Sequence, residues 1–373
     1  MSTSATTEIP ESATRYAGMS RGQAYIVLAL FVGLIVAGLV ISVGRVPKLS
    51  QGTGEGDFAL YTHVVERLQR GEAYHDALGT ELRLRQYPWQ SVFNWRTPLH
   101  LELLAHMPGT DWARYLLALG ALCAIVLSVG APFRKGEYGL CVWQTLLLAF
   151  PLAISAIPPV YFFAEMWAGV AIALSVGMYS LGWRKAGATT GIVALFFREL
   201  ALPYVLIGIF VAWRHKKKSE LWIWIVGFGA YALYFGLHAA AVLSRIPVLH
   251  GAPEVSRWIQ FGGLRFLLIT GSVGFLMTYP FWCSAIYLPC ALLGLAGWRH
   301  PLAGRVIATV AAYLLAFSVI GIPSANYYWG AVYAPLLAWG TPWTLTACKD
   351  LLGVILPPSW TETPEAPVRE MPG

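Results

Sequence analysis

The sequence contains few charged residues. Asp, Glu, Lys and Arg make up 12% of its 373 residues, and 57% are hydrophobic. Soluble domains carry about 25% charged residues, so this composition favours a membrane protein over a soluble one. Residues 24–44 carry no charge at all and are long enough as a helix to cross a bilayer core. Because this stretch also lacks an A-x-A-like cleavage site, we expect it to remain as a signal-anchor helix.

Residue patterns that hold disulfides or metals are also missing. The five cysteines show no C-x-x-C spacing, and the sequence has no paired histidines. A disulfide framework and a zinc site of the usual spacing are therefore not expected, and the cysteines are interpreted as small core residues. No cofactor is predicted from these patterns.

The basic residues are distributed unevenly along the chain. The net charge is +7, but many Lys and Arg lie in clusters such as 134–135, 184–185 and 214–218, whereas the loops 158–163 and 322–328 have none. This asymmetry follows the positive-inside rule and predicts that both termini lie in the cytoplasm. The basic balance is thus interpreted as membrane topology, not as a nucleic-acid partner.

The apolar segments predict an all-α polytopic membrane protein. The expected spans are 24–44, 112–131, 140–157, 164–183, 220–243, 280–298, 305–322 and 327–347. Residues 187–213 have cationic flanks at both ends, so we expect two short helices that enter and return, with a turn at Arg198 and Glu199 and with Pro203 starting the second. Residues 258–279 are expected to lie along the outer interface or to dip into it. The total is about ten transmembrane or re-entrant helices.

Polar segments divide the chain further. Residues 1–22 and 357–373 are expected to be disordered cytoplasmic tails on either side of a transmembrane domain over 23–356. Within that domain, 45–111 form a long first extracytoplasmic loop and 244–265 a second outer loop. A loop as long as the first is more often functional than a simple connection.

Asp57 precedes an amphipathic pattern in the first loop. Phe58, Tyr61, Val65 and Leu68 follow at i, i+3, i+7 and i+10, which predicts an interfacial helix suited to lying on the bilayer surface. Asp57 is open to two interpretations, a helix N-cap or a catalytic carboxylate. The two are compatible, because a capping Asp that faces a cavity can still accept a proton.

Other ionisable residues lie in unusually apolar surroundings. Arg96 follows a segment dense in aromatics, and its alternatives are an interfacial arginine or a substrate-binding one. Glu165, Arg198 and Glu199 lie within apolar segments, where charge is costly. They form either a structural Arg–Glu pair or a phosphate site, because the arginine fork suits bidentate phosphate binding. His250 in the second outer loop is either solvated or an additional cation.

Several of these residues fit a known pattern. The form G-D-F-x-x-Y…G-x-x-Y appears as Gly56, Asp57, Phe58, Tyr61, Gly71 and Tyr74. The segment 94–99 (NWRTPL) looks like an aromatic-proline segment without its usual double proline. With Glu165 and the hairpin around 197–200, these features resemble the GT-C superfamily of integral-membrane glycosyltransferases, and most closely its polyprenyl-phosphate-mannose-dependent mannosyltransferase branch. The resemblance covers roughly residues 24–215.

The resemblance implies a GT-C-like fold and an inverting glycosyltransferase of a bacterial inner membrane. The enzyme would transfer mannose or a similar sugar from a polyprenyl-phosphate donor to a lipid or glycan acceptor on the extracytoplasmic face. Asp57 would deprotonate the acceptor hydroxyl, and Arg198 would be the first choice for binding the departing phosphate beside Glu199. Arg96 or His250 would assist, and Glu165 would orient a sugar hydroxyl or hold an arginine.

One further departure and two alternatives qualify this expectation. Many relatives have an acidic pair in the first loop, and here the nearby pair is Glu55 and Asp57, which gives little support to a divalent metal. The main alternative is a transporter or flippase in which Arg198, Glu199 and Glu165 line a translocation path. The lack of an inverted repeat and the size of the first loop argue against it. The second alternative is a non-catalytic membrane scaffold.

Overall fold

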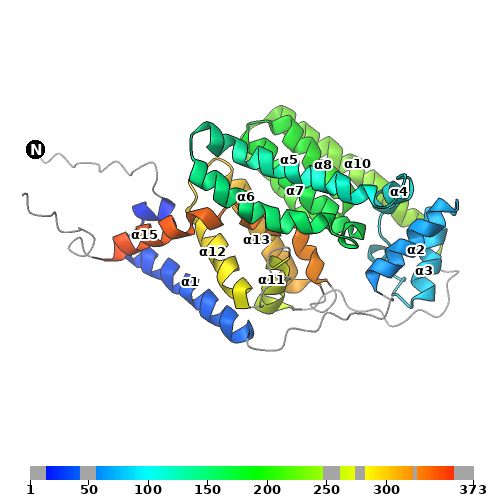
Figure 1. The fold of residues 1–373 in the computed structure, drawn as a ribbon, viewed down its shortest axis with the longest axis horizontal. Helices are drawn as coiled ribbons and strands as arrows, with labels where there is room; N and C mark the ends of the chain where they lie inside the picture. Colours follow the sequence, from blue (N-terminus) through cyan, green and yellow to red (C-terminus); the bar gives the residue numbers. More distant parts are fainter. Residues whose placement is uncertain (1–13, 43–55, 247–260, 274–281, 322–325, 357–373) are drawn as a thin grey trace, which may run out of the picture.

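The computed structural model describes residues 14–42, 56–246, 261–273, 282–321 and 326–356 (Figure 1). Within these ranges the regular elements are helices and no strand is present, as the sequence predicts. Four helical segments are long and apolar enough to cross a membrane, and they coincide with four expected spans. They are α1 (Arg21–Ser42), α5 (Trp112–Arg134), α6 (Tyr138–Ala153, continued to Ala156 by a 3-10 turn) and α10 (Lys218–Leu243). The chain is therefore a helical membrane protein.

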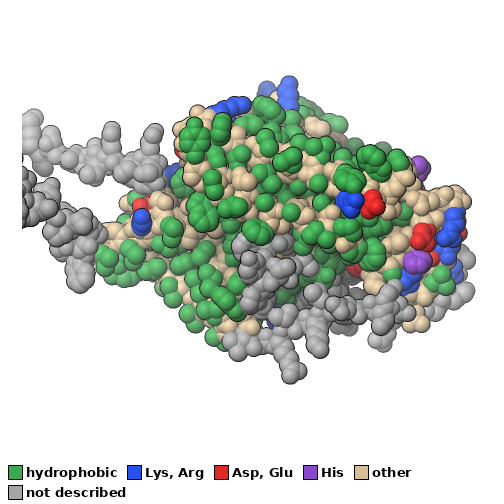
Figure 2. All heavy atoms as spheres, viewed as in Figure 1, with side chains coloured by type: hydrophobic (Ala, Val, Ile, Leu, Met, Phe, Trp, Pro, Cys, Tyr) green, Lys and Arg blue, Asp and Glu red, His purple; other side chains and the backbone are tan. Residues whose placement is uncertain are grey.

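The surface of these helices carries many large apolar side chains. Hydrophobic side chains cover most of the face seen in Figure 2, and large ones such as Leu119 and Leu122 of α5 are more than half exposed. A soluble protein rarely exposes a continuous apolar surface of this extent, whereas lipid tails require one.

The five cysteines are free and none of them is buried, so their interpretation as core residues is wrong. Cys123 instead lies exposed on α5.

Helix α7 (Ala164–Ser180) is the central element of the bundle. Most of its side chains are buried on every side, and it packs against both α5 and α8. A helix that is apolar all round is stable only when it is enclosed in this way. Two further expected spans are shorter helices, α12 (Trp282–Gly297) and α13 (Ala303–Val319), and α12 packs along α1.

The chain breaks where the sequence places a turn. Helix α8 (Arg184–Phe197) ends at Arg198, whose backbone is extended, and a 3-10 turn (Glu199–Ala201) leads into α9 (Leu202–Arg214). Pro203 lies in the first turn of α9, where its missing N–H costs nothing. The predicted hairpin of two short helices is thus present. It packs against α7, α10 and α13.

The expected span at 327–347 is wrong. This segment consists of η7 (Tyr327–Val332), α14 (Ala334–Leu337), η8 (Thr341–Trp343) and the start of α15 (Thr344–Ile355). A Cβ atom on Gly330 would overlap the Thr270 carbonyl of α11 (Gly263–Gly271), and one on Gly340 would overlap α12. Because these glycines let the backbones approach so closely, the short helices fit between their neighbours. Broken backbone is tolerated at such depth because protein surrounds it.

The segment predicted as the first outer loop forms a separate group of helices at one end of the bundle (Figure 1, right). It contains α2 (Asp57–Gln69), α3 (Tyr74–Leu84), a 3-10 turn (Val92–Asn94) and α4 (Pro98–Ala105). The amphipathic helix is confirmed, and its stripe packs against α3 and α4: Tyr61, Val65 and Leu68 are buried in protein, whereas Phe58 is 40% exposed. Most of the stripe is therefore available to neighbouring helices and not to lipid, and a position of α2 at the bilayer surface stays a prediction. An apolar stripe requires an apolar partner, and its periodicity is the same for lipid and for protein.

Part of the expected N-terminal tail is ordered. Residues Arg15–Gly18 form η1, in which the Tyr16 hydroxyl donates a hydrogen bond to the Leu293 carbonyl at 3.0 Å. The Thr14 hydroxyl donates to Asp350 of α15 at 2.7 Å. The prediction of disorder over 1–22 is therefore wrong from residue 14 onward. Residues 1–13 and the tail at 357–373 lie outside the described residues.

Candidate active site

Asp57 begins α2 and does not cap it. The N-cap position is Gly56, and no side chain makes the capping hydrogen bond, so the N-cap interpretation is wrong. The carboxylate instead accepts two hydrogen bonds, from the Tyr87 hydroxyl to Oδ1 at 2.7 Å and from the Tyr328 hydroxyl to Oδ2 at 2.6 Å. Asp57 is half-buried. The two donors fix its orientation, and each oxygen keeps a lone pair for an incoming proton.

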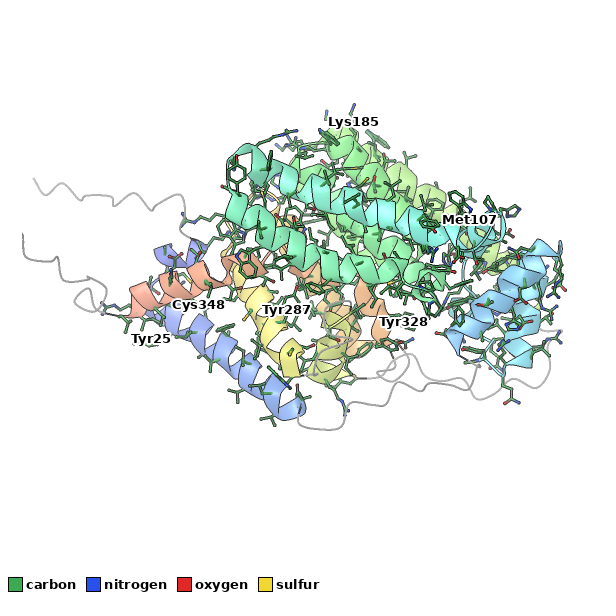
Figure 3. The ribbon with its side chains drawn as sticks, viewed as in Figure 1. Tyr25, Met107, Lys185, Tyr287, Tyr328 and Cys348 are labelled. Atoms are coloured by element: carbon green, nitrogen blue, oxygen red, sulfur yellow. The ribbon has the colours of Figure 1, made fainter. Side chains whose placement is uncertain are left out.

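The two tyrosines come from distant parts of the chain. Tyr87 follows α3, and Tyr328, labelled in Figure 3, belongs to η7 and lies 271 residues from Asp57. Burial and the Asp57 charge both raise the pKa of Tyr87 above its usual value, so this hydroxyl remains protonated and donates. Neither tyrosine stood out in the sequence as a partner of Asp57. In the sequence, Tyr328 stands between Tyr327 and Trp329, a run typical of membrane-interface aromatics, and in the structure it is buried.

Arg96 has no carboxylate partner among the described residues. Its Nε donates to the Tyr61 hydroxyl at 2.9 Å and its Nη1 to the Phe93 carbonyl at 3.3 Å. The Tyr74 hydroxyl donates to the Arg96 carbonyl at 2.6 Å. Both tyrosines of the G-D-F-x-x-Y…G-x-x-Y pattern therefore hold this arginine. Its charge is balanced only by more distant acids, which include Glu165 and Glu199.

Arg198 is paired with two carboxylates. Its Nε donates to Glu165 Oε1 at 2.7 Å, and its Nη1 donates to Glu199. The side chains of Arg198 and Glu165 are 2% and 1% exposed, and that of Glu199 is 24% exposed. The extended backbone at Arg198, between α8 and α9, directs the guanidinium toward α7. This is the geometry of the structural Arg–Glu alternative, and Glu165 lies in position to hold an arginine.

The Tyr61 hydroxyl lies among these groups. The charges of Asp57, Arg96, Glu165 and Arg198 are all close enough to affect its pKa. The structure thus brings together every described residue of the predicted set, with Glu199 joined through Arg198. His250 lies outside the described residues.

His100 of α4 is a member of this neighbourhood that the sequence did not reveal. It is buried, and its Nε2 has no hydrogen-bond partner among the described residues. Burial, together with the positive charges of Arg198 and Arg96, lowers its pKa to about 3. The imidazole is therefore neutral. A histidine between two leucines carries no sequence signal that would distinguish this role from ordinary packing.

The cluster combines a carboxylate, two guanidinium groups and several aromatic rings. The ring of Phe163 lies 4.7 Å from that of Tyr328 and 5.9 Å from that of Tyr61, measured between centroids.

An apolar groove of about 400 Å³ lies where α5 begins, lined by Met107 (Figure 3) and residues of the first turns of α5. Among the described residues, no three His, Cys, Asp or Glu side chains are grouped as metal ligands.

The arrangement can accept a proton at Asp57 and stabilise an anion at Arg96, beside aromatic surfaces. No protein-family model, curated protein or solved structure was found to match this chain. Its chemistry is therefore argued from the site itself.

Proposed function

We propose that this protein is a membrane glycosyltransferase. It transfers mannose or a similar sugar from a polyprenyl-phosphate donor to a hydroxyl of a lipid or glycan acceptor. The observation that carries the proposal is the Asp57 carboxylate, which two tyrosine hydroxyls hold at 2.6 and 2.7 Å. The same polar cluster contains Arg96, which no carboxylate of the described residues pairs with. A proton acceptor beside an anion-binding group is what such a transfer requires.

The proposed reaction is a single displacement. The acceptor oxygen attacks the anomeric carbon of the sugar while its proton passes to Asp57. The bond between the anomeric carbon and the phosphate oxygen breaks, and polyprenyl phosphate leaves with the electron pair. Arg96 stabilises the negative charge that develops on the phosphate. Attack opposite the leaving group inverts the anomeric configuration.

Arg96 suits the phosphate-binding role better than Arg198, which was the first choice from the sequence. The charge of Arg198 is balanced by Glu165 and Glu199, so a phosphate there would have to compete with two carboxylates. Arg96 has donors that no described carboxylate occupies. We propose that the Arg198–Glu165 pair holds the α8–α9 break in place against α7. Glu199, the partly exposed member of this cluster, pairs with the same arginine.

The proposal includes a topology and a location. The protein lies in a bacterial inner membrane with both termini in the cytoplasm. The first outer loop and Asp57 then lie on the extracytoplasmic face. This assignment rests on the positive-inside distribution of basic residues. The donor lipid approaches from the bilayer, and the protein requires no cofactor for the displacement.

The test is sugar transfer from a labelled polyprenyl-phosphate sugar in membranes that contain the full-length protein. Asp57→Asn is expected to lower the rate by about 10²–10⁴-fold, because an amide cannot accept the proton. The matched control is Asp76→Asn, since Asp76 is a carboxylate of the neighbouring α3 that is 61% exposed and pairs with Arg245. It should transfer sugar at the wild-type rate.

Two outcomes would overturn the proposal. Transfer by Asp57→Asn at the wild-type rate would remove Asp57 from the mechanism. Movement of a solute or lipid across the membrane, without any sugar transfer by the wild type, would establish the transporter or flippase alternative instead. A comparison of lipid extracts from cells with and without the protein would identify the missing product.

A further inference from the structure

A second cavity lies at the opposite end of α5 from the Asp57 cluster. Its volume is about 600 Å³, and it lies between the end of α5, the start of α6 and the residues that follow α12. The lining residues are Ala131, Pro132, Lys135, Glu137, Leu140, Gln144, Ser180, Trp298, Arg299, His300, Trp339 and Trp343. None of them belongs to the site described above.

Two cations and two neutral donors face this cavity. Lys135 and Arg299 are exposed and form no ion pair among the described residues, and Glu137 is the one carboxylate in the lining. Gln144 of α6 is 4% exposed, and no described residue forms a hydrogen bond with its amide. Because Gln144 lines the cavity, its amide donors are available there to a ligand or to water. The lining is therefore suited to an anion.

His300 adds a fixed donor. Its Nδ1 accepts a hydrogen bond from the Leu302 backbone N–H at 3.2 Å, so in the neutral ring Nε2 carries the proton. Burial and the charge of Lys135 lower the pKa of His300, which favours this neutral form. The ring stacks on Trp298 with centroids 4.9 Å apart and planes 5° from parallel. The donor is thus held in place before a ligand arrives.

Three tryptophans form the apolar part of the lining. Trp298 and Trp339 are buried with ring centroids 5.7 Å apart, and Trp343, the last residue of η8, is half-buried. Tryptophan is enriched at the depth of lipid headgroups, where one part of the ring contacts tails and another contacts polar groups. Cationic donors beside tryptophans provide both halves of an amphipathic ligand site.

We propose that this cavity binds the phosphate group of a lipid. Lys135 and Arg299 neutralise the phosphate charge, Gln144 and His300 donate to its oxygens, and the tryptophans contact the first part of the lipid tails. Under the proposed topology the cavity faces the cytoplasmic leaflet, on the side away from sugar transfer. Because the two sites share no residue, the failure of this proposal would leave the transfer reaction intact.

The test measures phosphatidic acid retained by the full-length protein, by native mass spectrometry after titration in detergent. The variant is the double substitution Lys135→Gln with Arg299→Gln, whose two side chains are exposed and so do not support the fold. Binding should weaken about tenfold or more, because charge-assisted hydrogen bonds to phosphate are among the stronger polar contacts. The matched control is Arg184→Gln with Lys185→Gln, an exposed basic pair that begins α8 outside the cavity lining.

The probes distinguish a lipid phosphate from its parts. Diacylglycerol with the same tails should bind at least tenfold more weakly, and inorganic phosphate should compete only weakly. Equal retention of diacylglycerol would overturn the phosphate assignment. Competition by inorganic phosphate at the concentration of the lipid would overturn the lipid assignment in favour of a free-phosphate site. An equal loss in the control pair would show that the cavity is not the site.

Discussion

Removing the Arg198 guanidinium is expected to destabilise the fold and not merely to weaken substrate binding. Arg198→Met keeps a long apolar side chain but leaves the Glu165 carboxylate charged, with no partner, at 1% side-chain exposure. Leaving one member of a buried pair uncompensated costs about 3–5 kcal/mol. Glu199 also loses its partner, but its side chain is 24% exposed and water solvates the carboxylate. The cost of this second lost ion pair is about 1 kcal/mol or less.

The source of this cost can be isolated by a second substitution. Glu165→Gln in the Arg198→Met background removes the stranded charge and keeps the side-chain volume. Most of the lost stability should return, with about 1–2 kcal/mol remaining for hydrogen bonds that are no longer made. Free energies of unfolding, measured by titration with a denaturing detergent in mixed micelles, complete a double-mutant cycle for the wild type, both single variants and the double variant. We expect a coupling energy of about 2 kcal/mol or more.

Arg96→Met provides the matched control. Arg96 has no carboxylate partner among the described residues, so its loss strands no buried charge and should cost only about 1 kcal/mol. An Arg198→Met variant within about 0.5 kcal/mol of the wild type would refute the buried-pair reasoning. Failure of Glu165→Gln to restore stability would refute it as well, since the stranded carboxylate would then not be the cause.

Three further predictions concern other parts of the site. Gly330→Ala should lower the thermal midpoint at a cost of about 1–3 kcal/mol, because its Cβ meets the backbone of α11, whereas Gly229→Ala, with open space around the new Cβ, should not. Lowering the pH from 6.5 to about 3 should destabilise the wild type, because over this range His100 takes up a proton only when the protein is unfolded. In His100→Gln, the free energy of unfolding should fall less steeply with pH, by about 1.4 kcal/mol per pH unit. An unchanged pH dependence of the unfolding free energy would contradict this. Arg96→Lys should raise the KM for the donor about tenfold without lowering the unfolding midpoint, while Arg70→Lys, at a side chain 71% exposed, leaves the KM unchanged.

The features that the sequence predicts correctly have local signals. An apolar run without charge is sufficient to predict α1, α5, α6 and α10, since length and hydropathy alone decide whether a helix can span a bilayer. The break at Arg198 was also predictable. Cationic flanks on both sides and a charged pair within an apolar segment are incompatible with one continuous crossing.

The features that the sequence does not predict depend on contacts between distant segments. The run 327–347 is apolar enough for a helix, and only the positions of α11 and α12 show why Gly330 and Gly340 are needed for close approach instead. In the same way, the stripe of α2 specifies an apolar face but not its partner. Periodicity reports that a face is buried, and it does not report what buries it.

The dependence of Asp57 on Tyr328 changes which part of the chain defines the candidate site. The resemblance to glycosyltransferases covers residues 24–215, yet one of the two hydroxyls that orient the carboxylate comes from η7. That helix is held in place because Gly330 allows it to lie directly against α11. A substitution at Gly330 should therefore disturb the geometry at Asp57 without touching it, and sugar transfer should fall together with stability. Under the proposed function, the C-terminal helices would then help to position Asp57.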